Sequence, residues 1–311
     1  TKSLTILRNF ALLLTPIVTL MTFSDLSQVS LALEAARPQA TDLMGELGIV
    51  AILSLLAWGL GYFGQPHILV RFMAADSVKS IPNARRIGMT WMILCLGGAV
   101  AAGFFGIAYF EANPALANVV NSNPETVFME LTKILFNPWI AGVVLAAILA
   151  AVMSTLSCQL LVCSSTLTED FYKSFLRRNA SQNELVWVGR GMVLLIALLA
   201  IWMAGNPESK VLGLVAYAWA GFGAAFGPLI ILSLFWRCMT LNGALAGMIV
   251  GAVMVIVWKN VWGDTGIYEI IPGFICSTIA IVVVSLLGQA PNTAVTYRFD
   301  EADRLYKDAN L

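Results

Sequence analysis

Long runs of hydrophobic residues alternate with short polar segments along the chain. Eight runs are long enough to cross about 30 Å of hydrocarbon, which takes about 20 helical residues. They cover approximately residues 5–24, 48–73, 88–110, 138–166, 187–204, 211–236, 243–259 and 270–288. The runs lack the short alternating segments of a membrane β-barrel, and lipid offers no hydrogen-bond partner to a bare backbone. The pattern predicts an all-α integral membrane protein with about eight transmembrane helices.

Composition supports a membrane protein and excludes several other classes. Hydrophobic residues make up 59% of the 311 residues and charged residues 12%, whereas a soluble chain carries about 25% charge. The net charge of zero argues against a nucleic-acid partner. The five cysteines are scattered, with no zinc or disulfide pattern. Nucleotide-binding and metalloprotease motifs are absent from the sequence. We therefore expect a channel or secondary transporter, with no enzyme activity and no organic cofactor.

The distribution of lysine and arginine predicts the orientation. Fourteen of these residues fall on one predicted side of the membrane and four on the other. The four are Arg37, Lys133, Lys210 and Lys259. Because cytoplasmic loops carry the excess of basic residues, we expect both ends of the chain in the cytoplasm. The domain prediction is a transmembrane domain over 1–288 and a cytoplasmic tail over 289–311. The segments 25–47 and 111–137 are expected to be external loops.

The second hydrophobic run contains signals for a broken helix. Three glycines and Pro66 fall between Trp58 and His67, and each glycine inside a helix costs about 1 kcal/mol relative to alanine. Pro66 cannot donate a backbone hydrogen bond. Trp58 and Tyr62 are four residues apart and would share one face of an α-helix. Two rings facing a cavity could hold a small zwitterion with a saturated ring, or they could be ordinary interface anchors beside close-packing glycines.

The fourth and sixth runs contain further candidates. Ala151, Ser154 and Thr155 have the spacing of one helical face. Two hydroxyls and the Ala151 carbonyl can offer oxygen ligands to sodium, although the hydroxyls may equally bond back to carbonyls one turn earlier. In the sixth run, Gly223, Gly227 and Pro228 could form a hinge or gate, or could simply let helices pack closely.

Together these stretches resemble the sodium/solute symporter family. The resemblance is carried by residues 58–67, 150–158 and 217–228, and it extends over most of the chain. It implies an inverted-repeat fold of ten core helices, of which this chain would hold core helices five to ten and two trailing helices. The chain begins at Thr1 rather than methionine, so we expect that upstream helices are missing here.

The resemblance also implies a function and its residues. Sodium-coupled uptake of L-proline by alternating access, in a bacterial inner membrane, is the expected activity. Solute binding is assigned to Trp58, Tyr62 and Pro66. A sodium role is carried to Ala151, Ser154 and Thr155. The alternatives are another solute, such as pantothenate or a different amino acid, a membrane sensor module, or a fragment that is inert by itself.

Overall fold

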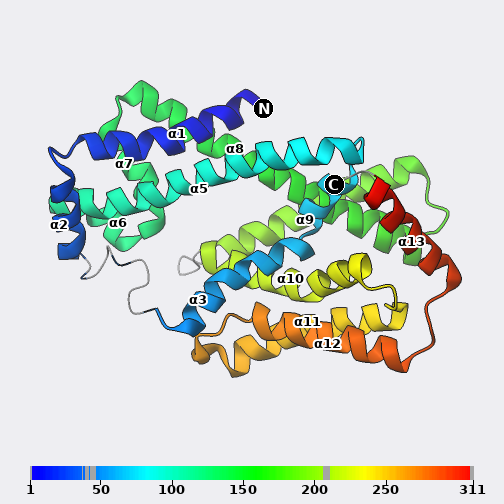
Figure 1. The fold of residues 1–311 in the computed structure, drawn as a ribbon. Coiled ribbons are helices and arrows are strands. Elements are labelled where there is room, and N and C mark those ends of the chain that lie inside the picture. Colours follow the sequence, from blue (N-terminus) through cyan, green and yellow to red (C-terminus); the bar gives the residue numbers. More distant parts are fainter. Residues whose placement is uncertain (1, 37, 39–41, 43–46, 206–210, 309–311) are drawn as a thin grey trace. The chain divides into compact units, whose positions relative to one another are not determined.

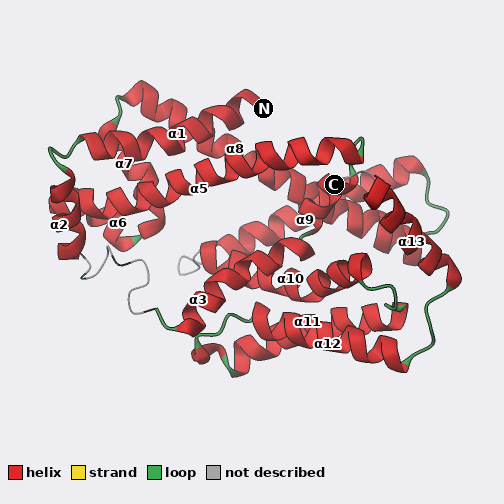
Figure 2. Ribbon diagram, in the orientation of Figure 1, coloured by secondary structure: helices red, strands yellow, loops and turns green. Residues whose placement is uncertain are grey.

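The computed structural model describes residues 2–36, 38, 42, 47–205 and 211–308. In these residues all regular structure is helical (Figures 1 and 2). The chain divides into two compact units, one made of residues 1–46 and 82–159 and the other of residues 47–81 and 160–311. Arg37 and Lys210, two of the four basic residues expected outside, lie beyond the described residues.

The first unit is built on three long helices, α1 (Lys2–Met21), α5 (Ile81–Ala112) and most of α8 (Pro138–Ser165), with shorter helices beside them. The shorter elements are α2 (Leu26–Ala36), η3 (Pro114–Leu116), α6 (Asn118–Ser122), η4 (Pro124–Thr126) and α7 (Val127–Leu135). Buried Val29 and Leu33 of α2 pack with Ala108 of α5. A second cluster joins α5 to α7, which contributes the fully buried Leu131.

The second unit contains a broken helix and a bundle of three long helices. Its elements are α3 (Ile49–Leu56), η1 (Ala57–Gly64), α4 (Pro66–Met73), η2 (Val78–Ser80), the π-helix η5 (Thr166–Leu176), α9 (Gln182–Ala204), α10 (Val211–Phe235), α11 (Leu241–Val261), η6 (Gly263–Thr265), α12 (Ile270–Leu287) and α13 (Thr293–Asp308). The core around Ala220, Ala224 and Val255 joins α10 to α11 and includes Ala57 of η1. Figure 1 shows α11 and α12 side by side, where the Ser277 hydroxyl donates to the Gly247 carbonyl at 2.9 Å.

The number of spans agrees with the sequence prediction. Within the part of the chain that the structure describes, six helices are long and apolar enough to cross a membrane, and the number rises to eight if each of two bent pairs is one span. In each of the six helices, no more than 33% of the most apolar 18-residue window is buried within the protein. Their remaining apolar surface is suited to contact with lipid, because lipid tails are as apolar as the side chains. The chain is therefore a multi-pass, all-α integral membrane protein.

The segments expected as two external loops and a tail contain helices. The loop predicted at 25–47 contains α2, which meets the second half of α1 at 100°. The loop predicted at 111–137 contains α6 and α7, and the tail predicted at 289–311 contains α13. These helices lie outside the predicted spans because their apolar residues are too few to cross a membrane, although those of α2 are spaced for one buried helix face. In α2 these residues are Val29 and Leu33, four positions apart.

The tail helix is joined to the polar turn between α10 and α11. Arg237 donates from Nε and Nη2 to the two carboxylate oxygens of Asp300, at 2.8 and 2.7 Å. Both side chains are more than half exposed, so this bidentate pair fixes geometry more than it contributes stability.

Candidate functional site

The helix over residues 49–73 is interrupted at Gln65, as the glycines and proline predict. Residues 49–64 and Pro66–Met73 differ in direction by 52°. Gln65 has the extended backbone angles φ −84° and ψ 114°, and Pro66 is the first residue of α4. Proline is well placed there, because the first residue of a helix has no intrahelical use for an N–H. The break therefore follows directly from the Gly64-Gln65-Pro66 sequence.

Glycines allow the backbones of η1 and α10 to approach each other closely. A Cβ built on Gly64 would collide with the Phe222 carbonyl, and one built on Gly61 would collide with the Trp219 ring. A Cβ on Gly223 would lie 2.7 Å from the Gly61 Cα. Real Cβ atoms do not tolerate such separations. These positions thus require glycine because two backbones approach each other.

The predicted hinge residues of α10 lie in this packed surface. The helix is continuous from Val211 to Phe235 and contains Pro228 in its interior. A Cβ on Gly227 would lie 2.6 Å from the Phe274 ring. Close packing thus accounts for Gly223 and Gly227, and a hinge at Gly223, Gly227 and Pro228 stays a prediction.

The predicted solute residues surround one tryptophan of α10. Trp219 stacks on Trp58 at 5.7 Å between ring centroids and meets Tyr62 edge-on at 4.9 Å. The Trp219 indole N–H also donates to the Trp58 carbonyl at 2.9 Å. Tyr62 remains 44% exposed. The two candidate rings thus lie in one aromatic cluster, with Trp219 as their common neighbour.

The prediction that Trp58 and Tyr62 share a face of an α-helix is wrong in its geometry. They lie in a 3₁₀ helix, where about three residues complete a turn and positions four apart diverge. Contact with Trp219 brings them together instead. Sequence reasoning did not single out Trp219, because other aromatic residues stand in the same stretch of the sixth run. They are Tyr217, Phe222 and Phe226.

Gln65 is a second residue that the sequence reasoning overlooked. Its side chain is buried, with the residue only 5% exposed, at the point where the helix breaks. Its amide Nε2 donates to the Trp219 carbonyl at 3.4 Å. A buried amide beside extended backbone is a plausible ligand group for a zwitterion, since it offers both a donor and an acceptor.

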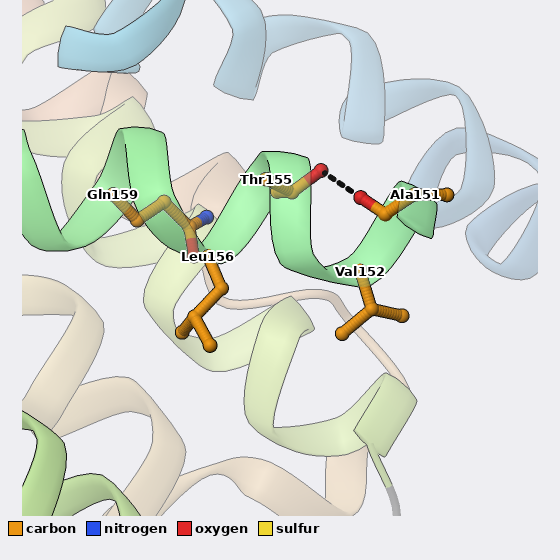
Figure 3. Close-up of a pocket in the computed structure, with 5 residues that line it drawn as sticks. All are labelled: Ala151, Val152, Thr155, Leu156 and Gln159. Carbon is orange, nitrogen blue, oxygen red and sulfur yellow. Dashed lines mark hydrogen bonds between the residues drawn. The ribbon is translucent and has the colours of Figure 1, made fainter. Parts of the chain in front are cut away.

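The predicted sodium residues lie on α8, in the first unit. Ala151 and Thr155 line an open cavity of about 410 Å³ together with Val152, Leu156 and Gln159 (Figure 3). Gln159 continues the same face at the next turn and was not predicted. Ser154 is exposed and is not among the lining residues.

The Thr155 hydroxyl donates to the Ala151 carbonyl at 3.2 Å (Figure 3). A hydroxyl bonded back to a carbonyl one turn earlier is the alternative that the sequence left open. This bond does not prevent the hydroxyl from binding a cation. The hydroxyl proton is engaged in the bond to the Ala151 carbonyl. The hydroxyl oxygen keeps lone pairs that can coordinate a cation. Within the described ranges there is no cluster of three or more His, Cys, Asp or Glu side chains that could hold a metal ion. A sodium ion at α8 would therefore depend on hydroxyl and carbonyl oxygens, the ligands a hard cation prefers.

Comparisons with known proteins identify the family of the chain. The model of the sodium:solute symporter family matches residues 4–251. The chain is 64% identical to the sodium/proline symporter of Escherichia coli strain K12 over 300 residues, covering 96% of this chain and 60% of that protein. It is 51% identical to the high-affinity proline transporter PutP of Bacillus subtilis strain 168, covering 94% of this chain and 61% of that protein. The chain thus spans about 60% of the length of these relatives.

A solved structure shares the fold. It is a Na⁺-coupled sialic acid symporter in a substrate-bound, outward-open state, with a TM-score of 0.69 and 19% sequence identity. The match covers 92% of this chain and 61% of that one. At this identity the likeness concerns the fold alone.

Proposed function

The chain belongs to the sodium:solute symporter family, and from this membership we propose that it takes part in sodium-coupled uptake of L-proline across a bacterial inner membrane. The observation that carries the proposal is the 64% identity to a curated sodium/proline symporter over 96% of this chain. The protein acts as a secondary transporter and not as an enzyme. Sodium, L-proline and the lipid bilayer are its partners.

Solute binding is assigned to the broken helix. Trp58, Tyr62 and Pro66 lie around the interruption at Gln65, where the backbone leaves helical geometry. Transporters of this kind place the solute near interrupted helices, because unwound backbone offers free donors and acceptors. The exposed Tyr62 ring offers apolar contact to the pyrrolidine ring, and the Gln65 amide offers a polar contact.

Sodium binding is assigned to Ala151, Ser154 and Thr155 of α8. These residues provide up to three oxygens, and a complete site needs about six in the manner of other hard cations. Further ligands must therefore come from another segment. The uneven distribution of lysine and arginine supports placing both ends of this chain in the cytoplasm.

Alternating access couples the two ligands. Sodium moving inward through 100 mV releases about 2.3 kcal/mol, and a tenfold concentration gradient adds about 1.4 kcal/mol. At one sodium per solute, these terms support a solute gradient of roughly several hundredfold. Coupling requires that sodium increase solute affinity and that solute increase sodium affinity by the same factor.

The test is uptake of labelled L-proline into proteoliposomes under an inward sodium gradient, compared with an equal potassium gradient. Both this chain and the full-length product of its gene are measured. Sodium-dependent uptake by the full-length product is expected. If it fails while pantothenate or another amino acid is taken up, the proposal for proline is wrong. A competition panel of these solutes then identifies the substrate.

A further inference from the structure

The turn between α11 and α12 reaches the broken helix through Tyr268. The Tyr268 ring stacks on the Trp58 ring with centroids 6.1 Å apart and planes inclined by 16°. Trp58 is also stacked on Trp219. Trp58 is thus fixed against two rings, each from a segment more than 150 positions away in the sequence.

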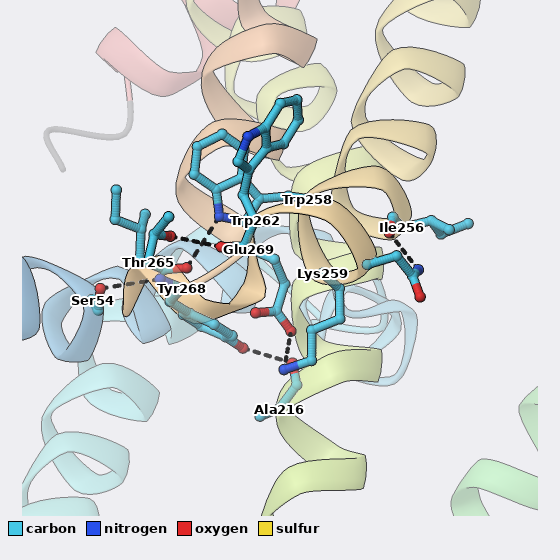
Figure 4. A network of polar contacts seen from close by, with 11 residues as sticks. Ser54, Ala216, Ile256, Trp258, Lys259, Trp262, Thr265, Tyr268 and Glu269 are labelled. Atoms are coloured by element: carbon cyan, nitrogen blue, oxygen red, sulfur yellow. Dashed lines mark hydrogen bonds and ion pairs between the residues drawn. The ribbon is translucent and has the colours of Figure 1, made fainter.

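Hydrogen bonds tie Tyr268 to the segments on both sides of this stack (Figure 4). Its backbone N–H donates to Ser54 Oγ of α3 at 3.1 Å, and its phenol O–H donates to the Ala216 carbonyl of α10 at 2.6 Å. Ser54 Oγ in turn donates to the Gly266 carbonyl at 3.2 Å. One residue therefore connects α3, which leads into η1, with α10, which carries Trp219.

The turn that presents Tyr268 is itself held in place. The Trp258 indole N–H donates to the Ile267 carbonyl at 3.3 Å, and Lys259 lies 3.8 Å from the buried carboxylate of Glu269 (Figure 4). Gly266 adopts φ +71°, a left-handed conformation that glycine adopts without strain. Burial, and to a lesser extent the Glu269 carboxylate, raise the pKa of the Tyr268 hydroxyl above its ordinary value. The hydroxyl therefore remains a protonated donor at physiological pH.

We propose that Tyr268 is a positioning residue for the solute site, which sets the place of Trp58 and of η1 against α10. The proposal rests on the solute role proposed above for Trp58 and Tyr62. Tyr268 acts through Trp58 and is not itself assigned a contact with solute. Its substitution should therefore change solute affinity through the orientation of the broken helix.

The first test separates the ring from the hydroxyl. Tyr268→Phe keeps the stack and the backbone bond to Ser54 but removes the donor to Ala216, whereas Tyr268→Leu removes the ring as well. We expect the half-saturation concentration for L-proline to rise roughly 2- to 10-fold in the leucine variant, the size of one aromatic pair, and by less in the phenylalanine variant. The maximal rate per transporter in the membrane should be retained in the phenylalanine variant. Tyr297, largely exposed on α13, takes the same two substitutions as a control.

The second test needs no solute. Phe63 lies in η1 and is 46% exposed. Phe63→Cys is made in a protein whose native cysteines are all replaced, and maleimide labelling is timed with and without Tyr268→Leu. A faster rate is expected with Tyr268→Leu and an unchanged rate with Tyr297→Leu, because only the former frees η1.

The two tests distinguish this proposal from the proposed function. If the unsubstituted protein takes up no proline, the function fails, and the labelling rate alone decides the role of Tyr268. The positioning role is overturned if labelling is unchanged by Tyr268→Leu. It is also overturned if the variants only lose abundance in the membrane while the half-saturation concentration stays that of the unsubstituted protein.

Discussion

Gly223 of α10 offers a direct test of the close contact between α10 and η1. A methyl group placed there would lie 2.7 Å from the Gly61 Cα and 2.8 Å from the Ile270 Cδ1. The Ile270 side chain can rotate away, but the Gly61 backbone cannot. Gly221, two residues earlier on the same helix, has nothing within 4 Å of its hypothetical Cβ. Gly223→Ala and Gly221→Ala are therefore a matched pair.

The size of the effect follows from these separations. Ordinary van der Waals contact begins at 3.4 Å, so Gly223→Ala must move η1 away from α10 by about 0.7 Å, the difference between 3.4 and 2.7 Å. Overpacking of this kind costs about 1–3 kcal/mol. Gly221→Ala meets no obstacle and should gain up to about 1 kcal/mol from helix propensity. Gly223→Ala gains the same helix propensity, so the two variants should differ by the overpacking cost alone, roughly 1–3 kcal/mol.

Thermal unfolding of the purified full-length protein in detergent measures the difference. A gap of about 1–3 kcal/mol corresponds to an apparent melting temperature a few degrees lower for Gly223→Ala than for Gly221→Ala. Proline uptake supplies a second measurement, because a displacement of about 1 Å at a binding site can cost a large factor in activity. We expect a higher half-saturation concentration for Gly223→Ala and an unchanged one for Gly221→Ala. Equal melting temperatures and equal uptake in the two variants would refute the backbone contact between Gly61 and Gly223.

Three further predictions concern other parts of the molecule. Thr155→Ala should raise the sodium concentration needed for uptake, whereas Ser157→Ala, at a position that does not line the cavity of Ala151 and Thr155, should not; a shared sodium dependence would remove Thr155 from the site. Tyr62→Ala should raise the half-saturation concentration for proline, measured by uptake at saturating sodium, and wild-type affinity would exclude the ring from the pocket. Asp300→Asn should leave the melting temperature unchanged, because the pair with Arg237 is exposed to solvent; a clear decrease would show that α13 supports the bundle.

The sequence predicted the spans and the interruption because both depend on local chemistry. Hydrophobic run length marks a membrane helix, and Gly64-Gln65-Pro66 marks a break within one. The partners of Trp58 could not be predicted in this way. Trp219 lies 161 positions from Trp58, and Tyr268 lies in a short turn whose composition resembles that of any polar connection. Only the packing of α10 and α12 against η1 brings these rings together.

The role of α8 illustrates a different limit. The spacing of Ala151 and Thr155 correctly placed them on one face, which lines a cavity. The same spacing placed Ser154 with them, yet it is not among the lining residues. Helical periodicity places residues three and four positions apart on the same broad face. Ser154, three positions after Ala151, lies at the edge of that face. Gln159 belongs to this face but was overlooked because no hydroxyl marked it.

The glycine contact between η1 and α10 also has a mechanical consequence. Where Gly61 and Gly64 meet Gly223 and the Phe222 carbonyl, both surfaces are bare backbone. Such a surface has no side chains that interlock, so a small slide of one helix along the other requires no rotamer change there. Trp219 is the exception, because its indole lies against Gly61 and bonds to the Trp58 carbonyl. The resistance of this joint to sliding therefore depends on the few side chains that bridge it, chiefly Trp219 and, at its edges, Gln65 and Tyr268.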